Sequence, residues 1–300
     1  MIDFAGRTAF VTGGANGVGL GIARALLAEG AKVAIADIRQ DSIDKALESF
    51  DNQEAMGIRL DVSDRADWPR AADEVEERLG PVSLLFNNAG INLFQTIDES
   101  SFDDWDWVMG VNLHGVINGV MTFVPRMKAR GLGGYIVNTA SMASFLAAGA
   151  PGIYNTTKFA VRGLTESLRY GLAPHGIGVS VLCPGLVNSY IYASDDVRPD
   201  ALKGAMKPVD IANVERLEQL HQYGMEPDVI AARVLDGMRE NRAHIFPHPE
   251  FRDELADLFE ETLADFRDYP QDPGFEQRTG FENMRRENYR KAREAARRAI

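Results

Sequence analysis

The sequence predicts an α/β protein with a Rossmann-type, doubly wound parallel sheet, formed by a single domain with a C-terminal helical extension. Short apolar runs recur along the chain, and a stretch with helical character follows almost every one of them. Such alternation is typical of a parallel sheet that helices cover on both faces. A glycine-rich turn, VTGGANGVG at residues 11–19, directly follows the first apolar run and marks the first strand-to-helix junction.

The first half of the chain contains four predicted strands. RTAFVT at 7–12 is a short apolar run, and residues 19–30 after it form a predicted helix with Gly30 as its C-cap. KVAIAD at 32–37 and VSLLFNNAG at 82–90 are apolar runs of the kind found in strands buried on both faces. MGIRL at 56–60 lies between them, and predicted helices at about 40–50 and 64–79 separate the strands.

Two long predicted helices, at about 102–129 and 152–173, dominate the second half. Each leads into a strand, GYIVNTAS at 134–141 and GIGVSVLCPG at 176–185. Residues 186–225 break the alternation, because they contain prolines and charges and no clear strand. A loop of that length in a compact domain is usually functional, so we treat it as a candidate substrate loop. A helix at about 227–241 and a short strand at 243–248 follow.

Residues 1–249 form the predicted main domain, and residues 250–300 form a charged helical C-terminal extension. Asp and Glu outnumber Lys and Arg by eleven to three over 250–283, and from Arg285 onward Lys and Arg outnumber Asp and Glu by seven to two. A solvated helical surface is the simplest interpretation. The alternative is that the two halves attract each other or a neighbouring subunit.

The composition is that of an ordinary folded protein, with 45% hydrophobic and 25% charged residues in 300. The formal net charge of −12 argues against nucleic acid and anionic membranes as partners, because both would repel the chain. The single cysteine, Cys183, fits a reducing compartment. We find no signal peptide, long apolar run or metal-ligand pattern, and we therefore expect a cytoplasmic protein without a metal.

The glycine-rich turn predicts a dinucleotide site in the main domain. Gly13, Gly17 and Gly19 allow a sharp turn and close approach of a pyrophosphate to the N-terminus of the following helix. The next strand ends in Asp37, which is placed to accept hydrogen bonds from the adenosine ribose and to repel a 2′-phosphate. This pattern favours NAD over NADP, although the nearby Arg39 leaves NADP as an alternative.

Polar residues stand at the ends of three further strands, where open parallel sheets bind ligands. Asp61 and Val62 end the third strand, Asn88 lies in the NNAG turn after the fourth, and Ser141 ends the fifth. Taken singly, these residues have structural interpretations as a helix cap, a polar turn and an N-cap. Their joint position along one edge of the sheet favours a binding site.

YNTTK places Tyr154 and Lys158 four residues apart, on one face of a predicted helix. A neighbouring ammonium group favours the phenolate and lowers the pKa of a tyrosine, which would make Tyr154 a general base near neutral pH. Taken alone, the spacing more often belongs to a partly buried tyrosine beside a solvated lysine.

Together these motifs resemble the short-chain dehydrogenase/reductase family over residues 5–246. TGGANGVG matches its TGxxxGxG motif, NNAG its fourth-strand motif and YNTTK its YxxxK motif, with Ser141 thirteen residues before Tyr154. Asn112 matches the catalytic asparagine, and PGLVNS matches the PGxVxT turn with Ser189 in place of threonine. The resemblance implies an NAD-dependent alcohol dehydrogenase, a dinucleotide-binding catalytic domain over 1–249, and a homodimer.

The resemblance also assigns the site residues. The expected catalytic set is Asn112, Ser141, Tyr154 and Lys158. The expected cofactor-binding set is Gly13, Asn16, Gly17, Val18, Gly19, Asp37, Asp61, Val62, Asn88, Tyr154, Lys158, Val187 and Ser189. In this scheme Tyr154 is the base, Ser141 holds the substrate oxygen, Lys158 contacts the nicotinamide ribose, and Asn112 holds a water that relays the proton.

Three segments resemble a narrower group, the lignin aryl-ether Cα-dehydrogenases of soil bacteria: DWDWVMGVNLHGVINGVMTFVPRM, LHQYGMEPD and HIFPHPEFRDEL. This resemblance implies oxidation of the benzylic alcohol of a β-O-4-linked aromatic dimer, and it favours the αS form. Candidate substrate contacts are Phe145, Tyr190, Tyr192, His221 and Met225, with Asn92 and Phe94 as further possibilities; ordinary packing is the alternative for each of them. The alternatives are a hydroxysteroid or 3-oxoacyl type of dehydrogenase and a non-catalytic NAD-sensing protein.

Overall fold

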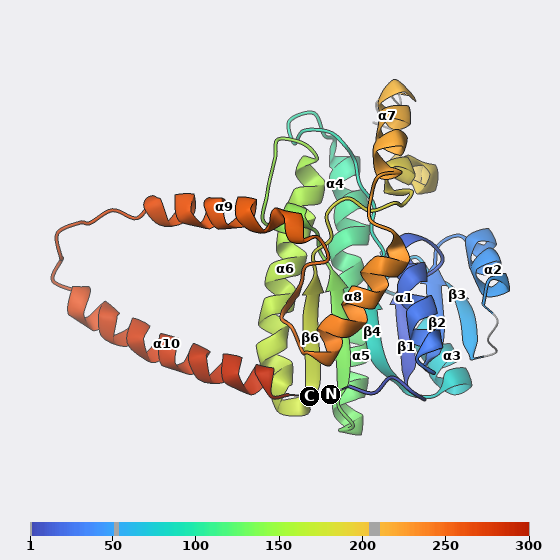
Figure 1. Cartoon of the computed structure of the whole chain (residues 1–300), viewed down its shortest axis with the longest axis horizontal. Coiled ribbons are helices and arrows are strands. Elements are labelled where there is room, and N and C mark those ends of the chain that lie inside the picture. The colour runs from blue at the N-terminus through green and yellow to red at the C-terminus, as the bar shows by residue number, and fades with distance from the viewer. Residues whose placement is uncertain (1, 51–53, 204–210, 300) are drawn as a thin grey trace.

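The computed structural model describes residues 2–50, 54–203 and 211–299 (Figure 1). Seven parallel strands form one sheet in the order β3-β2-β1-β4-β5-β6-β7, which confirms the predicted doubly wound fold. The order reverses direction beside β1, and ligands bind at such a point in open α/β sheets. The strands are β1 Thr8–Thr12, β2 Lys32–Asp37, β3 Ala55–Arg59, β4 Val82–Asn87, β5 Gly134–Thr139, β6 Ile177–Leu182 and β7 His244–Ile245.

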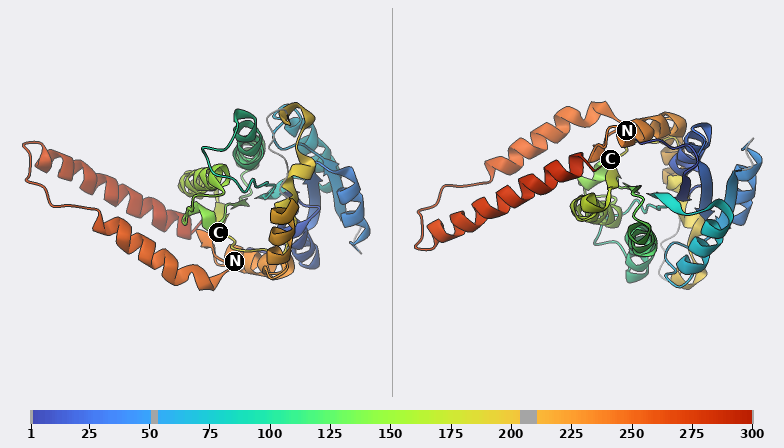
Figure 2. Two further views of the ribbon diagram at one scale, coloured as in Figure 1. Left: turned by 90° about the horizontal axis from the view of Figure 1, so that it is seen from above. Right: turned by 90° about the horizontal axis from the view of Figure 1, so that it is seen from below.

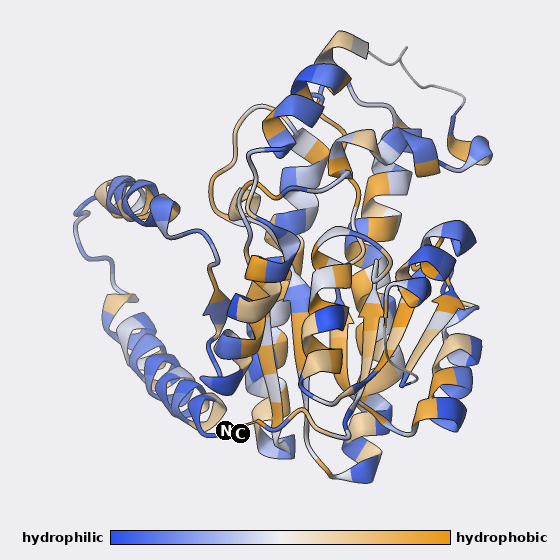
Figure 3. Cartoon of the chain, turned by 45° about the vertical axis from the view of Figure 1, so that its right-hand side comes forward, coloured by the Kyte–Doolittle hydropathy of each residue, from blue (hydrophilic) through white to orange (hydrophobic). Residues whose placement is uncertain are grey.

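Helices cover both faces of the sheet (Figure 1). One face packs against α1 (Gly17–Ala28), α2 (Gln40–Glu48) and α8 (Pro227–Arg239), whose buried Ile22, Ile43 and Ile230 join one core cluster. The other face packs against α3 (Trp68–Leu79), α5 (Gly115–Arg130) and α6 (Gly152–Leu172). Figure 3 shows hydrophobic residues concentrated on the strands and on the helix faces that cover them.

The predicted helix at 102–129 is interrupted by a π-helical turn. The segment consists of α4 (Phe102–Met109), the π turn Gly110–His114 and α5. Phe102–Arg130 is long and apolar enough to cross a membrane by length and composition alone. Here Phe123 of α5 is fully buried and contacts the ring of Phe10 in β1 at 4.9 Å between ring centroids, as expected for a core helix.

The predicted substrate loop, 186–225, contains helices in its described part. Short 3-10 turns cover Ile191–Val197 and Asp200–Leu202, and α7 covers Ile211–His221. The two ends of the loop meet in a parallel bridge between Val187 and Met225, where Met225 N donates to Leu186 O at 2.9 Å. The loop is therefore closed at its base, directly beside the end of β6.

The C-terminal extension forms a projecting arm made of α9 (Arg252–Ala264) and α10 (Phe275–Arg297). The two views in Figure 2 show both helices leaving one side of the body and joining at a distant tip. Figure 3 shows α10 as mainly hydrophilic. The extension is thus helical, as the sequence predicts.

Candidate active site

A cavity of about 500 Å³ opens where the strands end, between the glycine-rich turn, the ends of β4 to β6 and the candidate substrate loop. Most of the residues expected at the site line it: Gly13, Asn16, Gly17, Val18, Asp37, Asp61, Val62, Asn88, Ser141, Tyr154, Lys158, Val187, Ser189, Tyr190 and His221. This one cavity therefore brings together most of the predicted cofactor and catalytic residues with two of the predicted substrate residues, Tyr190 and His221.

The glycine-rich turn needs its glycines for two different reasons. Gly13 and Gly17 have positive φ angles of 60° and 49°, a region that residues with a side chain rarely adopt. Gly19 does not line the cavity, but a Cβ there would lie 2.1 Å from the Gly13 carbonyl oxygen. The first turn of α1 contains no acidic residue, so its N–H groups and helix dipole favour an anion such as a pyrophosphate.

Asp37 and Arg39 both line the cavity and contact each other. The Arg39 backbone N–H donates to Asp37 Oδ1 at 3.2 Å. Burial raises the pKa of Asp37, and the hydrogen bond and charge of Arg39 oppose that rise. With the Asn16 amide oriented so that its oxygen faces Arg39, that oxygen accepts from the guanidinium at 3.1 Å. The arginine side chain thus reaches back toward the glycine-rich turn.

The side chains at the ends of β1, β4 and β5 hold one another in place. Thr12 Oγ1 accepts from the backbone N–H groups of Asn88 at 2.9 Å and Ala89 at 3.0 Å. Asn88 Nδ2 donates to Thr12 O at 3.2 Å, and Asn88 Oδ1 accepts from Thr139 Oγ1 at 3.2 Å. Asn88 therefore fixes the three strand ends relative to one another beneath the cavity.

Tyr154 and Lys158 project from the first turns of α6 into the cavity. The Lys158 Nζ lies 5.3 Å from the centroid of the Tyr154 ring and donates to Thr139 O at 2.9 Å. Loss of water around the buried ammonium lowers the pKa of Lys158 to about 8. The pair thus faces the cavity from the helix face that the YxxxK spacing predicts.

The predicted lowering of the Tyr154 pKa is wrong for the protein alone. Burial raises the pKa of the phenol, and the hydroxyl of Ser141 opposes the rise without cancelling it. The ammonium of Lys158 faces the Tyr154 ring, and the cost of removing the phenolate from water exceeds the favourable interactions. The protein's own side chains therefore favour the neutral phenol over the phenolate.

Asn112 lies in the π turn and is buried behind the cavity. Its Nδ2 donates to Ile91 O at 2.9 Å and to Thr157 Oγ1 at 3.2 Å, and its Oδ1 accepts from Ile91 N at 2.8 Å. A Cβ on Gly90 would lie 3.4 Å from both Asn112 Oδ1 and Lys158 Nζ. Asn112 and Lys158 therefore face the same narrow space beside Gly90.

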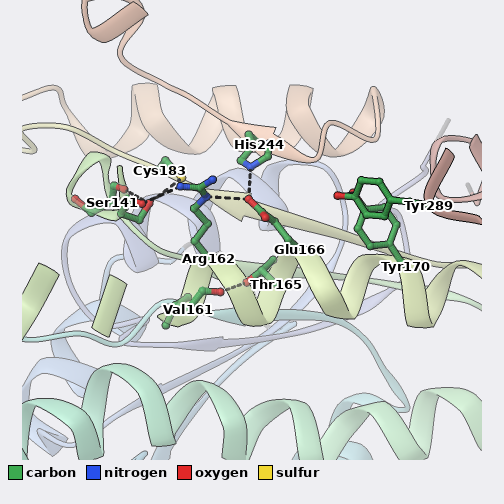
Figure 4. Close-up of polar contacts among 10 residues, drawn as sticks. Ser141, Val161, Arg162, Thr165, Glu166, Tyr170, Cys183, His244 and Tyr289 are labelled. Atoms are coloured by element: carbon green, nitrogen blue, oxygen red, sulfur yellow. Dashed lines mark hydrogen bonds and ion pairs between the residues drawn. The ribbon is translucent and has the colours of Figure 1, made fainter. Parts of the chain in front are cut away.

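Ser141 caps the short turn after β5. Its Oγ accepts from Ala143 N at 3.1 Å and donates to Pro184 O at 3.3 Å. Figure 4 shows the polar contacts beside this turn, in which Arg162 donates to Ser144 O at 3.1 Å and pairs with Glu166 at 2.8 Å. Glu166 in turn contacts His244 of β7 at 3.0 Å. The serine turn is thus tied to both α6 and the edge strand.

The candidate substrate residues separate into two groups. Tyr190 and His221 line the cavity, as do Asn92 and Phe94. Tyr192 packs behind His221 at 5.3 Å between ring centroids. Phe145 is buried outside the cavity against Arg162, and Met225 lies at the closed base of the loop.

Other lining residues were not identified from the sequence. These are mainly apolar side chains from α4, the π turn, the substrate loop and the residue directly before α9: Trp107, Val111, Ile191, Val197, Leu217, Leu220 and Phe251. Their apolar character is shared with core residues, so no residue pattern separates them from ordinary packing.

This fold and this arrangement of Ser141, Tyr154 and Lys158 define an oxidoreductase of the nicotinamide-dependent type, and the chain belongs to the short-chain dehydrogenase family. The family model for short-chain dehydrogenases matches residues 7–198. The C alpha-dehydrogenase of Sphingobium sp. SYK-6 is 39% identical over 276 residues, which are 91% of this chain and 90% of that protein. The protein is therefore an NAD(P)-dependent alcohol dehydrogenase.

Solved structures agree with this assignment. A short-chain dehydrogenase from Novosphingobium aromaticivorans is 57% identical with a TM-score of 0.86, and the match covers 99% of this chain and all of that one. A short-chain dehydrogenase/reductase from Burkholderia phymatum, solved in complex with NAD, is 34% identical with a TM-score of 0.84, covering 91% of this chain and 99% of that one.

Proposed function

We propose that the protein oxidises the benzylic Cα alcohol of lignin-derived β-aryl ether dimers, of the guaiacylglycerol-β-guaiacyl ether type, to the ketone. The observation that carries this proposal is the 39% identity to a C alpha-dehydrogenase across nine-tenths of both chains. The cavity supports it, because aromatic and aliphatic side chains from α4, the substrate loop and the turn before α9 line the cavity together with Tyr154. A two-ring substrate needs such an apolar pocket with a few polar contacts.

The catalytic groups have complementary tasks in this proposal. Ser141 Oγ and Tyr154 face the alcohol oxygen, and the phenolate of Tyr154 takes its proton as the Cα–H bond breaks. Lys158, fixed by Thr139 O, holds a positive charge against the Tyr154 ring. Asn112, fixed by Ile91 and Thr157, orients a water beside Lys158 that carries the proton onward. The protein therefore aligns the reactants and moves the proton.

NAD is the proposed cofactor, and the residues present fit it. It supplies the hydride acceptor and, in its oxidised form, a positive charge near the phenol. The glycine-rich turn suits its pyrophosphate and Asp37 its adenosine ribose, with Asp61, Val62 and Asn88 along the same wall. Because Arg39 also faces this end of the cavity, the choice between NAD and NADP depends on whether the carboxylate or the guanidinium is nearer the 2′ position.

The stereochemistry, location and assembly form part of the same proposal. We expect the αS form of the alcohol to be preferred, the protein to act in the cytoplasm, and the active species to be a homodimer. Exposed apolar side chains on α5 and α6, Met121 and Phe159, support association through these two long helices. We also retain residues 1–249 as the catalytic domain and 250–300 as an extension.

The deciding experiment measures NADH formation with the racemic β-aryl ether dimer, together with chiral analysis of the alcohol that remains. We expect one Cα configuration to be consumed and the aryl ketone to accumulate. The equilibrium should shift toward reduction of the ketone as the pH falls, because the oxidation releases a proton. Slow turnover of both enantiomers, with fast turnover of a steroid alcohol or a 3-hydroxyacyl thioester, would refute the substrate assignment and leave the enzyme class intact.

A further inference from the structure

The C-terminal arm, residues 252–297, contacts the body near its two ends. Near its start, the Phe259 ring contacts Phe145 at 6.3 Å between ring centroids. Near its end, the Tyr289 hydroxyl lies 3.2 Å from that of Tyr170, and Ala296 is buried. Figure 4 labels the two tyrosines, one on α6 and the other on α10. Between these anchors the arm stands away from the body (Figure 2).

The unattached part of the arm exposes large apolar side chains. Leu263, Phe266 and Tyr269 are 67%, 80% and 80% exposed, and Phe281 and Met284 of α10 are 69% and 57% exposed. An isolated surface helix has no reason to carry such side chains, and exposed apolar groups gathered on one segment mark sites of association. These side chains therefore indicate that another surface covers this part of the arm.

The charges of the arm identify what covers it. None of the carboxylates of α9 has an ion-pair partner in the part of the chain that the structure describes, whereas α10 carries Arg286 and Arg293, which pair with no carboxylate there. Other charges of α10 are satisfied within the helix, as in the pair of Arg290 with Glu287 at 2.9 Å. An acidic helix and a basic helix thus remain electrostatically unpaired in one and the same chain.

We propose that the arms of two copies of this chain exchange, so that the acidic α9 of one copy lies against the basic α10 of the other. A two-fold axis makes this contact twice, which is how identical surfaces associate in dimers. Each copy supplies both halves of the contact. The exposed apolar side chains between residues 263 and 284 then become buried between the two arms. Within one chain, α9 and α10 are anchored at separate places and form no ion pair with each other among the described residues.

The sign of the charges gives a test in which exchange and other dimer contacts predict different results. One full-length variant carries Asp257→Lys and Glu261→Lys, neighbours on one face of α9, and the other carries Arg286→Glu and Arg293→Glu on one face of α10. In a dimer of two identical variants, the α9 and α10 that meet across the exchanged contact carry the same sign of charge and repel each other. In a mixed dimer, opposite charges meet at both contacts. The two variants receive tags of different mass, are co-expressed, and are counted as dimers by native mass spectrometry.

We expect mixed dimers to form the large majority of the dimers, against about half for random pairing of identical interfaces. A chain with all four substitutions, paired with the wild type, should give the reverse result, with mixed dimers well below half. The control pair carries Glu77→Lys and Arg78→Glu, at exposed positions on α3, and should stay near half. Random pairing of the arm variants, or a wild type that is monomeric at micromolar concentration, would refute arm exchange. Neither result bears on the proposed substrate, which activity assays test separately.

Discussion

The imidazole of His248 holds the backbone of Gly185 in place at the end of β6. Its Nδ1 accepts from Gly185 N at 3.0 Å, and its Nε2 lies 2.9 Å from Leu186 O, so the ring carries its proton on Nε2. The Phe251 ring packs against the same glycine, where a Cβ would lie 2.4 Å from it. The start of the C-terminal extension thus supports the loop that contains Val187 and Ser189.

We expect His248→Leu to raise the KM for the nicotinamide cofactor about tenfold with a smaller effect on kcat, because the two hydrogen bonds that hold Gly185 and Leu186, directly before Val187 and Ser189, are lost. His248→Asn should recover part of the affinity, since its oxygen can take the place of Nδ1 as the acceptor. His175→Leu, at an exposed position, serves as the control. An unchanged KM in His248→Leu would show that the loop keeps its shape without the imidazole.

Tyr154→Phe tests the proton acceptor. The substitution removes one hydroxyl and leaves the glycine-rich turn and Asp37 untouched, so we expect kcat to fall by about 10²–10⁴ while NADH binding, followed by fluorescence, changes little. Substantial remaining turnover would exclude Tyr154 as the base.

Lys158 provides a prediction for stability against pH. Burial lowers its pKa in the folded protein to about 8, below its ordinary value of 10.5, so between these two pH values the unfolded chain binds more protons. Stability should therefore rise with pH across this window, by about 3 kcal/mol in total, and be lowest below pH 8. Lys158→Met should remove this rise and be more stable than the wild type at pH 7.

Chemical denaturation of the cofactor-free proteins between pH 7 and 10 measures this difference. Lys128→Met, on the last turn of α5, is a control for general loss of charge. Parallel pH curves for Lys158→Met and the wild type would contradict the lowered pKa.

Asp37 and Arg39 provide a prediction for cofactor choice. Asp37→Ser removes the carboxylate that repels a 2′-phosphate and leaves Arg39 in place to attract it. We expect the ratio of kcat/KM for NAD over that for NADP to fall by about 10²-fold, since charged hydrogen bonds to the ribose contribute about 2–3 kcal/mol. Steady-state kinetics with both cofactors checks this, with Asp41→Ser, on α2, as the control. A wild type that already prefers NADP would reverse the assignment.

The positions of the strands along the sequence and the residues at their ends were predictable, because buried parallel strands are short apolar runs and their carboxyl ends meet at one edge. The π turn that contains Asn112 could not be predicted, because its residues have the same apolar character as the helix around them. Helix α7 lies in a stretch whose prolines and charges suggested a loop. The raised pKa of Tyr154 depends on burial, which sequence spacing does not express.

The buried ion pair between Arg198 and Asp104 fastens the substrate loop to α4. Arg198 Nη1 lies 2.6 Å from Asp104 Oδ1, and both side chains are almost fully buried. Asp104 also caps α4 through Ser101, and its interactions with Ser101 and Arg198 outweigh burial and lower its pKa. Arg198 further donates to Leu202 O at 2.7 Å and lies over the Trp107 ring, which lines the cavity.

Arg198→Leu should destabilise the protein by about 3–5 kcal/mol, because it leaves the Asp104 carboxylate buried without its partner. The same change should raise the KM for the alcohol substrate more than the KM for the nicotinamide cofactor, since the residues that the ion pair fastens are candidate substrate contacts in the lining of the cavity. Adding Asp104→Asn removes the unpaired charge and should recover part of the stability without restoring the substrate KM, because the loop remains unfastened. Thermal denaturation and steady-state kinetics of the single and double variants separate the two effects. A double variant with a normal substrate KM would mean that the ion pair stabilises the fold and has no part in shaping the site.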